Sequence, residues 1–285
     1  MEEEKVISTQ DSLTPSATVH ELSENVMTGK ADYSKTKMFT LAIAAGAFIA
    51  FGAQVSLTVM TGDSNMGWGF TKLIGAMTFA TGLMIVALTG AELFTGNVMM
   101  TFAVLEKKVS LLKLLRSWTV VYIANFLGSI LVAGLIYGAG MGHNGGVTAM
   151  QTAFSKINLT FGEAFFRGIL CNWLVCLAIF MASTSKRVIG KIFAIFFPIM
   201  TFVASGYEHS VANMFFIPNG LLMKHFPSIV AASGMTPDQL ATMTWKGFFL
   251  HNLLPVTLGN IVGAFVFVVL LFWTAYLREE HRQQR

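Results

Sequence analysis

Hydrophobic residues occur along this chain in long runs that short charged stretches separate. Four of the runs carry no charged residue and extend over Met38–Met60, Trp118–Met141, Gly168–Ser185 and Leu253–Leu277. Two longer runs, residues 73–105 and 192–223, contain one glutamate each, Glu92 and Glu208, and the second also contains His209. About 20 apolar residues cross a bilayer as a helix. The pattern therefore predicts six membrane-crossing segments, of which the second and fifth are too long for one simple crossing.

The composition supports a membrane protein and excludes other classes. Of the 285 residues 54% are hydrophobic and 12% are charged, whereas soluble proteins carry about 25% charged residues. The net charge of +4 is small and lies in short clusters, so no nucleic-acid partner is expected. Cys171 and Cys176 point to different sides of a helix and are interpreted as apolar packing residues. No Cys or His pair has metal-ligand spacing, so no metal or other cofactor is expected.

The distribution of basic residues predicts the orientation. With the N-terminus in the cytoplasm, fourteen Lys and Arg residues lie inside and five outside, as the positive-inside rule requires. We therefore expect a multi-pass protein of the inner (cytoplasmic) membrane with both termini in the cytoplasm. Residues 1–36 form a cytoplasmic segment, 37–278 the transmembrane domain and 279–285 a cytoplasmic tail.

The polar N-terminal segment contains one short helical pattern. Thr18 and Glu21 have the spacing of a capping box, and Val19, Leu22 and Val26 share a helical face. Its acidic start does not fit a signal peptide. The pattern is compatible with a short interfacial helix and with a lid over a pore on the cytoplasmic side.

The chain contains an internal repeat. The stretch Gly90–Asn97 in the second run matches Gly206–Asn213 in the fifth, because Gly, Glu, a small residue and Asn recur at the same spacing. An Asn-x-x-Gly pattern recurs in the third and sixth runs, at Asn125/Gly128 and Asn260/Gly263. Segments one to three thus repeat as four to six. Since three is odd, the second copy enters the membrane from the opposite side, which is typical of channels and transporters.

Each repeat places a glycine and a carboxylate inside an apolar run. Gly90 and Gly206 weaken a helix, so the second and fifth helices are predicted to break near the middle of the membrane. Positive helix ends then converge where an anion is favoured. Glu92 and Glu208 are interpreted as supports that accept hydrogen bonds from the amides freed at the breaks. A proton-carrying role is the alternative.

His209 is the strongest candidate for chemistry. An ionisable group at this depth is costly, and histidine changes charge near neutral pH. Asn213 follows at i+4 on the same face, and Thr95 offers a hydroxyl from the other repeat. The alternative is a neutral histidine that donates to a carbonyl exposed by the break.

Four apolar residues and two polar ones are further candidates for a pore. Taken singly, the apolar ones are compatible with core packing; stacked around one histidine they form constrictions that block unneutralised ions. The four are Phe79, Leu83, Leu93 and Phe202. Lys156 is either a solvated charge or an attractor of anions at the outer mouth, and Asn172 is explained by an interhelical hydrogen bond.

Three motifs make the chain resemble the formate/nitrite transporter family, and most of all its formate channels. They are Gly90–Gly96, Gly168–Cys176 and Phe202–Met214, and the similarity runs from about Lys35 to the end. The resemblance implies an all-α, aquaporin-like protomer of six transmembrane helices in an inverted 3+3 repeat, with helices 2 and 5 broken. It also implies a homopentamer with one pore per protomer.

The resemblance also assigns residues to the pore. His209 matches the central histidine, Thr95 a loop threonine, Asn213 and Asn172 the asparagines, and Lys156 the basic residue of the outer vestibule. Leu93 and Phe202 match one constriction layer, with Phe79 and Leu83 adjoining it.

The expected function is a channel for small monovalent anions of weak acids, and formate is the expected substrate. Lys156 and the helix dipoles draw the anion in, His209 supplies or shares a proton, and the neutral acid crosses the apolar rings. Nitrite, hydrosulfide and lactate are also small conjugate bases of weak acids, so they remain alternative substrates. A neutral-solute pore of aquaporin type would carry paired Asn-Pro-Ala motifs, which neither repeat has. No nucleophile–base pair is visible, so we expect no enzyme.

Overall fold

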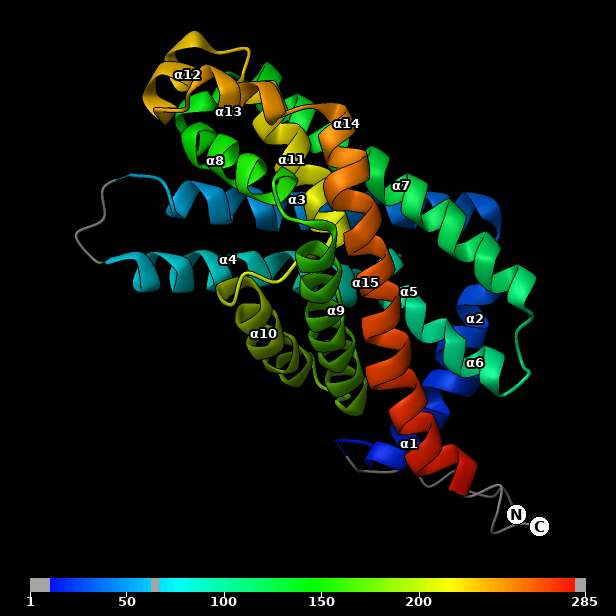
Figure 1. Ribbon diagram of the computed structural model, residues 1–285. Coiled ribbons are helices and arrows are strands. Elements are labelled where there is room, and N and C mark those ends of the chain that lie inside the picture. Colours follow the sequence, from blue (N-terminus) through cyan, green and yellow to red (C-terminus); the bar gives the residue numbers. More distant parts are fainter. Residues whose placement is uncertain (1–10, 63–66, 280–285) are drawn as a thin grey trace, which may run out of the picture.

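The computed structural model describes residues 11–62 and 67–279, and in these ranges the protein is helical throughout (Figure 1). The one β-type contact there is an isolated antiparallel bridge between Ser12 and Ser185. The predicted all-α membrane fold is confirmed. The acidic first residues and the tail from residue 280 lie outside the described ranges.

Five of the helices described are long and apolar enough to cross a membrane. They are α3 (Lys35–Val59), α4 (Gly67–Thr89), α7 (Leu111–Gly138), α9 (Phe161–Thr184) and the continuous run Trp245–Arg278. That last run comprises α14 (Trp245–Gly247), η4 (Phe248–Leu253), α15 (Leu254–Ala264), η5 (Phe265–Leu270) and η6 (Trp273–Arg278).

The second and fifth hydrophobic runs are both divided. After α4 the chain continues as α5 (Phe94–Asn97), η2 (Val98–Met100) and α6 (Thr101–Leu105). The fifth run forms α10 (Val188–Ala204) and α11 (Ser210–Met223). Shorter helices connect the long ones: η3 (Met141–His143), α8 (Gly146–Ile157), α12 (Pro227–Ser233) and α13 (Pro237–Thr242). In Figure 1, α8, α12 and α13 lie at the end of the molecule opposite the two termini.

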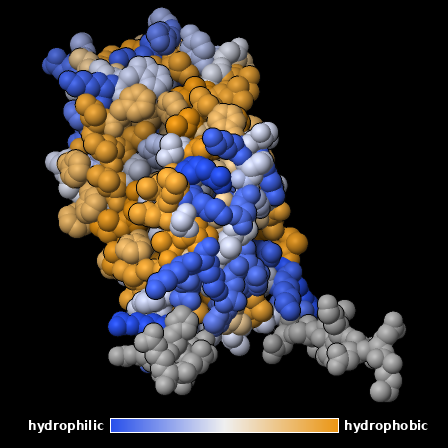
Figure 2. All heavy atoms as spheres, turned by 90° about the vertical axis from the view of Figure 1, so that its right-hand side faces the viewer, coloured by the Kyte–Doolittle hydropathy of each residue, from blue (hydrophilic) through white to orange (hydrophobic). Residues whose placement is uncertain are grey.

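The outer surface is apolar where a bilayer would contact it. On α7 an exposed row with a spacing of four residues consists of Ile123, Leu127, Leu131 and Leu135. Figure 2 shows hydrophobic side chains spread over one flank of the molecule and hydrophilic ones at its upper end and around its lower part. Because exposing such an apolar row to water is unfavourable, the surface fits a protein embedded in lipid or packed against further copies of itself.

Glycines set how closely the long helices pack. A methyl group on Gly128 of α7 would collide with the backbone oxygen of Ile43 in α3, and one on Gly263 of α15 with that of Ile169 in α9. The glycine of each Asn-x-x-Gly pattern is therefore a contact point between backbones. Cys171 and Cys176 are buried free thiols, as predicted.

The N-terminal segment folds back onto the protein as α1 (Pro15–Glu21), η1 (Leu22–Val26) and α2 (Met27–Ala31). The predicted capping box at Thr18 is wrong. Thr14 caps the helix by accepting a hydrogen bond from the amide of Ala17, because Pro15 fixes the first helical position. Thr18 instead donates to the Thr14 carbonyl.

Apolar burial and ion pairs hold this segment in place. Val19 and Leu22 are buried, whereas Val26 is exposed because the π-turn of η1 rotates it away. A hydrogen bond from Lys108 holds the pKa of Glu24 below its ordinary value. This contact is therefore present at neutral pH and is lost when acid protonates the carboxylate. The buried face fits a helix docked on protein better than one floating at a lipid interface.

We expect Gly128→Ala to lower the free energy of unfolding by about 1–3 kcal/mol, because the added methyl forces α3 and α7 apart. Denaturant unfolding in detergent measures the loss. Gly134→Ala on the same helix is the control, since nothing lies within 4 Å of the added methyl. Equal losses in both variants would contradict the close-packing argument.

Candidate functional site

Both breaks have the same backbone form. Gly90 and Gly206 have φ angles of +70° and +74°, a left-handed conformation that glycine adopts without steric cost. After each glycine the next amide turns back onto the preceding helix, from Ala91 to the Val86 carbonyl and from Tyr207 to the Phe202 carbonyl, both at 3.0 Å. This bond pattern is that of a Schellman cap. The predicted breaks are thus observed at the predicted glycines.

One asparagine closes each break. Asn125 Oδ1 accepts from the Phe94 amide at 2.9 Å, and Asn125 Nδ2 donates to the carbonyls of Ala42 and Glu92. Its carboxamide therefore makes three buried hydrogen bonds.

Asn260 does the same in the other half. Its Oδ1 accepts from the Ser210 amide at 2.9 Å, and its Nδ2 donates to the carbonyls of Gly168 and Glu208. The Asn-x-x-Gly patterns therefore supply both the clamp of the break and the close helix contact.

The two glutamates have partners other than the expected ones. Glu92 lies 2.8 Å from Lys30 Nζ and accepts from Asn97 Nδ2 at 2.7 Å. The expectation that the freed amides bind the carboxylates is wrong, because the asparagine clamps already satisfy those amides. The carboxylates instead neutralise partly buried lysines.

Glu208 makes the matching set of contacts with Lys156 at 2.7 Å, Asn213 at 2.7 Å and Asn252 at 3.1 Å. Lys156 therefore forms an ion pair, with 14% of its side chain exposed, and its ammonium also lies 5.4 Å from the ring centre of Phe216. The charge predicted to attract anions is largely balanced by a carboxylate.

Lys30 and Asn252 are site residues that the sequence analysis missed. Lys30 comes from α2 in the folded-back segment, and Asn252 from the π-turn of η4. A signal exists for each: Lys30 and Lys156 both precede the first span of their half. Asn252 precedes Asn260 by eight residues, as Ser117 precedes Asn125. Ser117 lies beside Asn97, the counterpart of Asn213.

His209 caps α11 and joins the two halves. Its Nδ1 accepts from the Ala212 amide at 3.1 Å, and its Nε2 lies 2.8 Å from Thr95 Oγ1. A neutral imidazole carries one N–H, so these bonds assign the hydrogen to Nε2, which donates to Thr95. The predicted meeting of Thr95 with His209 is observed. The residue that caps α5 in the equivalent position is Leu93.

Asn172 supports this contact from α9. Its Nδ2 donates to the carbonyls of Thr95 at 3.2 Å and Asn260 at 2.8 Å. The interhelical hydrogen bond expected for Asn172 is thus present, and it fixes the backbone that carries the Thr95 hydroxyl.

A cavity of about 160 Å³ lies on one side of the histidine and is called the histidine cavity here. Its lining includes His209, Phe79, Phe202, Lys72, Lys156 and Asn213. The rings of Phe79 and Phe202 are 5.7 Å apart and nearly perpendicular, and Phe202 stacks on His209 at 6.0 Å. Asn213 Oδ1 is buried without a hydrogen-bond partner in the described part of the chain.

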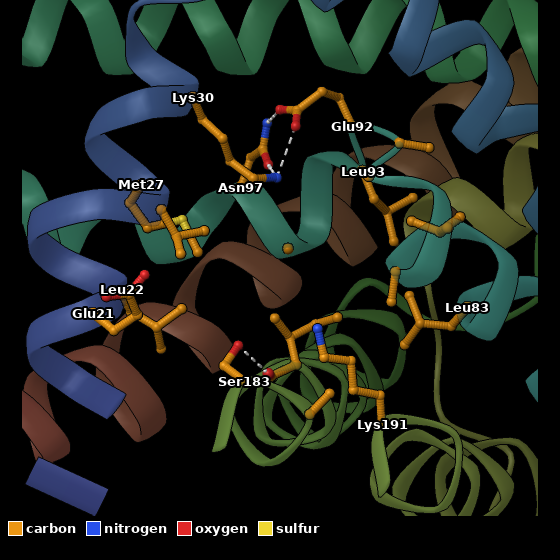
Figure 3. A pocket seen from close by; sticks show the side chains of 18 of the residues that line it. Glu21, Leu22, Met27, Lys30, Leu83, Glu92, Leu93, Asn97, Ser183 and Lys191 are labelled. Carbon is orange, nitrogen blue, oxygen red and sulfur yellow. Dashed lines mark hydrogen bonds and ion pairs between the residues drawn. The ribbon is translucent and has the colours of Figure 1, made fainter. Parts of the chain in front are cut away.

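A larger cavity of about 740 Å³ lies beneath the N-terminal segment and is called the terminal cavity (Figure 3). Leu83 and Leu93 line it, with Lys30 reaching across to Glu92 and Asn97. The expected layer of Leu93 with Phe202 stays a prediction; Leu93 lines this cavity and Phe202 lines the histidine cavity. Leu83 and Leu93 thus line the terminal cavity, and Phe79 and Phe202 line the histidine cavity.

Among the described residues, no group of three or more His, Cys, Asp or Glu side chains is arranged to hold a metal ion. The polar groups at the breaks are instead bonded to one another. The site offers an imidazole, a carboxamide and apolar walls, which suit a small permeant.

Comparison with known proteins places these features in one family. The family model described as formate/nitrite transporter matches residues 17–274, a range that begins ahead of the expected start near Lys35. The chain is 41% identical over 263 residues to the "Probable formate transporter" of Methanothermobacter thermautotrophicus, covering 85% of this chain and 90% of that protein.

It is 38% identical over 275 residues to the "Formate channel FocA" of Escherichia coli K12, covering 94% of this chain and 96% of the relative. Among solved structures, the "Pentameric formate channel with formate bound" superposes with a TM-score of 0.77 at 38% identity. That match covers 85% of this chain and 98% of the other.

We expect Glu208→Gln to lower the free energy of unfolding by about 3 kcal/mol or more, because it leaves the Lys156 ammonium buried without its counter-charge. Adding Lys156→Met should restore part of the loss. Lys108→Met, which removes a half-exposed partner of Glu24, should cost about 1 kcal/mol or less. Thermal or denaturant unfolding in detergent measures all three. Similar costs for the two sites would show that burial of the Glu208 pair is unimportant.

Proposed function

This chain belongs to the formate/nitrite transporter family, and from that premise we propose that it is a channel for formate that exchanges protons with its permeant at His209. The observation that carries the proposal is one imidazole in the lining of the histidine cavity, stacked on Phe202. In the proposal, Leu83, Leu93, Phe79 and Phe202 form a narrow apolar passage from this cavity to the terminal cavity. The names of the relatives, formate channel and formate transporter, support formate as the substrate.

The apolar pairs favour a neutral permeant over an anion. A bare monovalent anion that leaves water for a passage lined by Leu83, Leu93, Phe79 and Phe202 loses its hydration without gaining counter-charges. Formic acid carries no charge and is small. Because a carboxyl group has a pKa of about 4, the acid readily gives up its proton again and formate is regenerated. When formate takes up a proton at the edge of the passage, most of the free-energy barrier to its crossing is therefore removed.

His209 is the group placed to supply that proton. In the proposed step an imidazolium gives its proton to a formate oxygen, which leaves neutral imidazole and formic acid. To become imidazolium the neutral ring must take a proton at Nδ1, and Nδ1 then releases the Ala212 amide it holds at 3.1 Å. Thr95 keeps the ring in position during this exchange through Nε2.

Asn213 and the helix dipole assist on the side of the histidine cavity. The free Oδ1 of Asn213 can accept the acid O–H of formic acid or a hydrogen from water. The N-terminus of α11 points its positive end at His209 and favours an arriving anion. The ion pairs of Glu92 and Glu208 stabilise the conformation of the two helix breaks.

We propose the remaining features of the family likeness for this chain as well. They are six transmembrane segments in an inverted 3+3 repeat, a homopentamer with one pore per protomer, and an inner-membrane location with both termini cytoplasmic. The matching hydrogen bonds of the two halves support the repeat, and the pentameric relative supports the assembly. Residues 1–36, 37–278 and 279–285 are the proposed divisions. The N-terminal segment, which walls the terminal cavity, is the proposed lid.

His209→Asn should abolish proton-coupled formate uptake into vesicles that contain the purified protein. Asparagine is a good helix cap, so it can keep the Ala212 amide bonded while it removes the titrating ring. Uptake of formate against pH, from about pH 5 to pH 8, measures the loss.

The control for this prediction is His143→Asn, which changes an exposed histidine outside the cavities. It should keep the pH profile of the unsubstituted protein. An unchanged profile in His209→Asn would exclude the histidine as the proton donor.

Nitrite is the second candidate substrate, because the matching family model covers both anions. Parallel uptake of formate, nitrite and hydrosulfide by the same vesicles ranks them. Faster nitrite uptake at equal concentrations would reassign the substrate but leave the proton-exchange step in place.

A further inference from the structure

The histidine cavity contains more positive charge than the ion pair of Glu208 can balance. Three basic side chains line it, Lys72, Lys156 and Arg167, against the single carboxylate of Glu208. Lys156 takes that carboxylate at 2.7 Å. The charge left over belongs to Lys72 and Arg167.

Lys72 lies on the face of α4 that lines the passage. It precedes Phe79 by seven residues, or two helical turns, and both side chains border the histidine cavity. Lys72 is half-buried and lies within electrostatic range of Lys156 and Glu208. In the described ranges no ion pair or hydrogen bond engages its ammonium.

Arg167 differs from Lys72 in its surroundings. Its guanidinium lies within electrostatic range of Glu163 on the preceding turn of α9. The carboxylate near Lys72 is that of Glu208, which is already paired with Lys156.

We propose that Lys72 is the residue that concentrates small anions in the histidine cavity, while Lys156 serves mainly to neutralise Glu208. This inference rests on the proposed channel function and assigns its anion selectivity on this side to a residue of α4. An uncompensated ammonium in a half-enclosed cavity raises the local concentration of anions, and low-dielectric walls strengthen the effect. Placed two turns ahead of Phe79, Lys72 acts on the anion before the apolar passage and before His209.

The test is formate uptake by vesicles against formate concentration, at low and at high ionic strength. Lys72→Met should raise the half-saturating formate concentration about three- to tenfold at low ionic strength. It should change the maximal rate by less than about twofold, because the proton-exchange site stays intact. At high ionic strength the difference should shrink, since salt screens the lost charge. Lys72→Arg should behave like the unsubstituted protein.

Lys246→Met is the matched control, because Lys246 is exposed and does not line the cavity. Three outcomes would overturn the inference: an unchanged half-saturating concentration in Lys72→Met, the same rise in Lys72→Arg, or the same rise in Lys246→Met. Uptake by the unsubstituted protein no faster than by empty vesicles would instead refute the channel function itself. The two failures are therefore distinguishable.

Discussion

The structure depends on satisfying backbone groups where two helices stop inside an apolar layer. The residues that carry these groups, Glu92, Phe94, Glu208 and Ser210, are buried, so their amides and carbonyls need partners within the protein. Asn125 and Asn260 each supply one acceptor and two donors in the required geometry. Because these bonds also tie α7 to α3 and α15 to α9, one side chain per half sets both the local break and the packing of the long helices around it.

The charged groups at the breaks also need partners within the protein. Each break contains a buried glutamate, and a lysine from a separate element neutralises it: Lys30 from α2 and Lys156 from α8. A buried ion pair contributes little net stability, but removing one partner is costly because it leaves the other charge buried without a counter-charge. Each pair therefore couples its break to the docking of a separate helix, α2 or α8.

The sequence was sufficient to predict features that depend on single residues. Gly90 and Gly206 break their helices because of backbone conformation, and His209 is conspicuous because an ionisable ring in an apolar run is rare. Features that depend on distant docking were missed. Lys30 reaches Glu92 only because the N-terminal segment folds back, and Asn252 lies in a π-turn. Comparing the two repeat copies indicates both positions, but residue spacing does not show which side chain each of them contacts.

The two halves differ at the cap of the helix that follows each break, where one has Leu93 and the other His209. A scaffold that is nearly duplicated therefore carries its titrating ring in a single copy. Under the proposed function every permeant meets one such ring, whichever way it travels. When the acid leaves with the proton it received and the ring is reprotonated from the side of entry, one hydrogen ion accompanies each carboxylate and no net charge crosses. When the ring takes its proton back, the charge of the anion crosses instead.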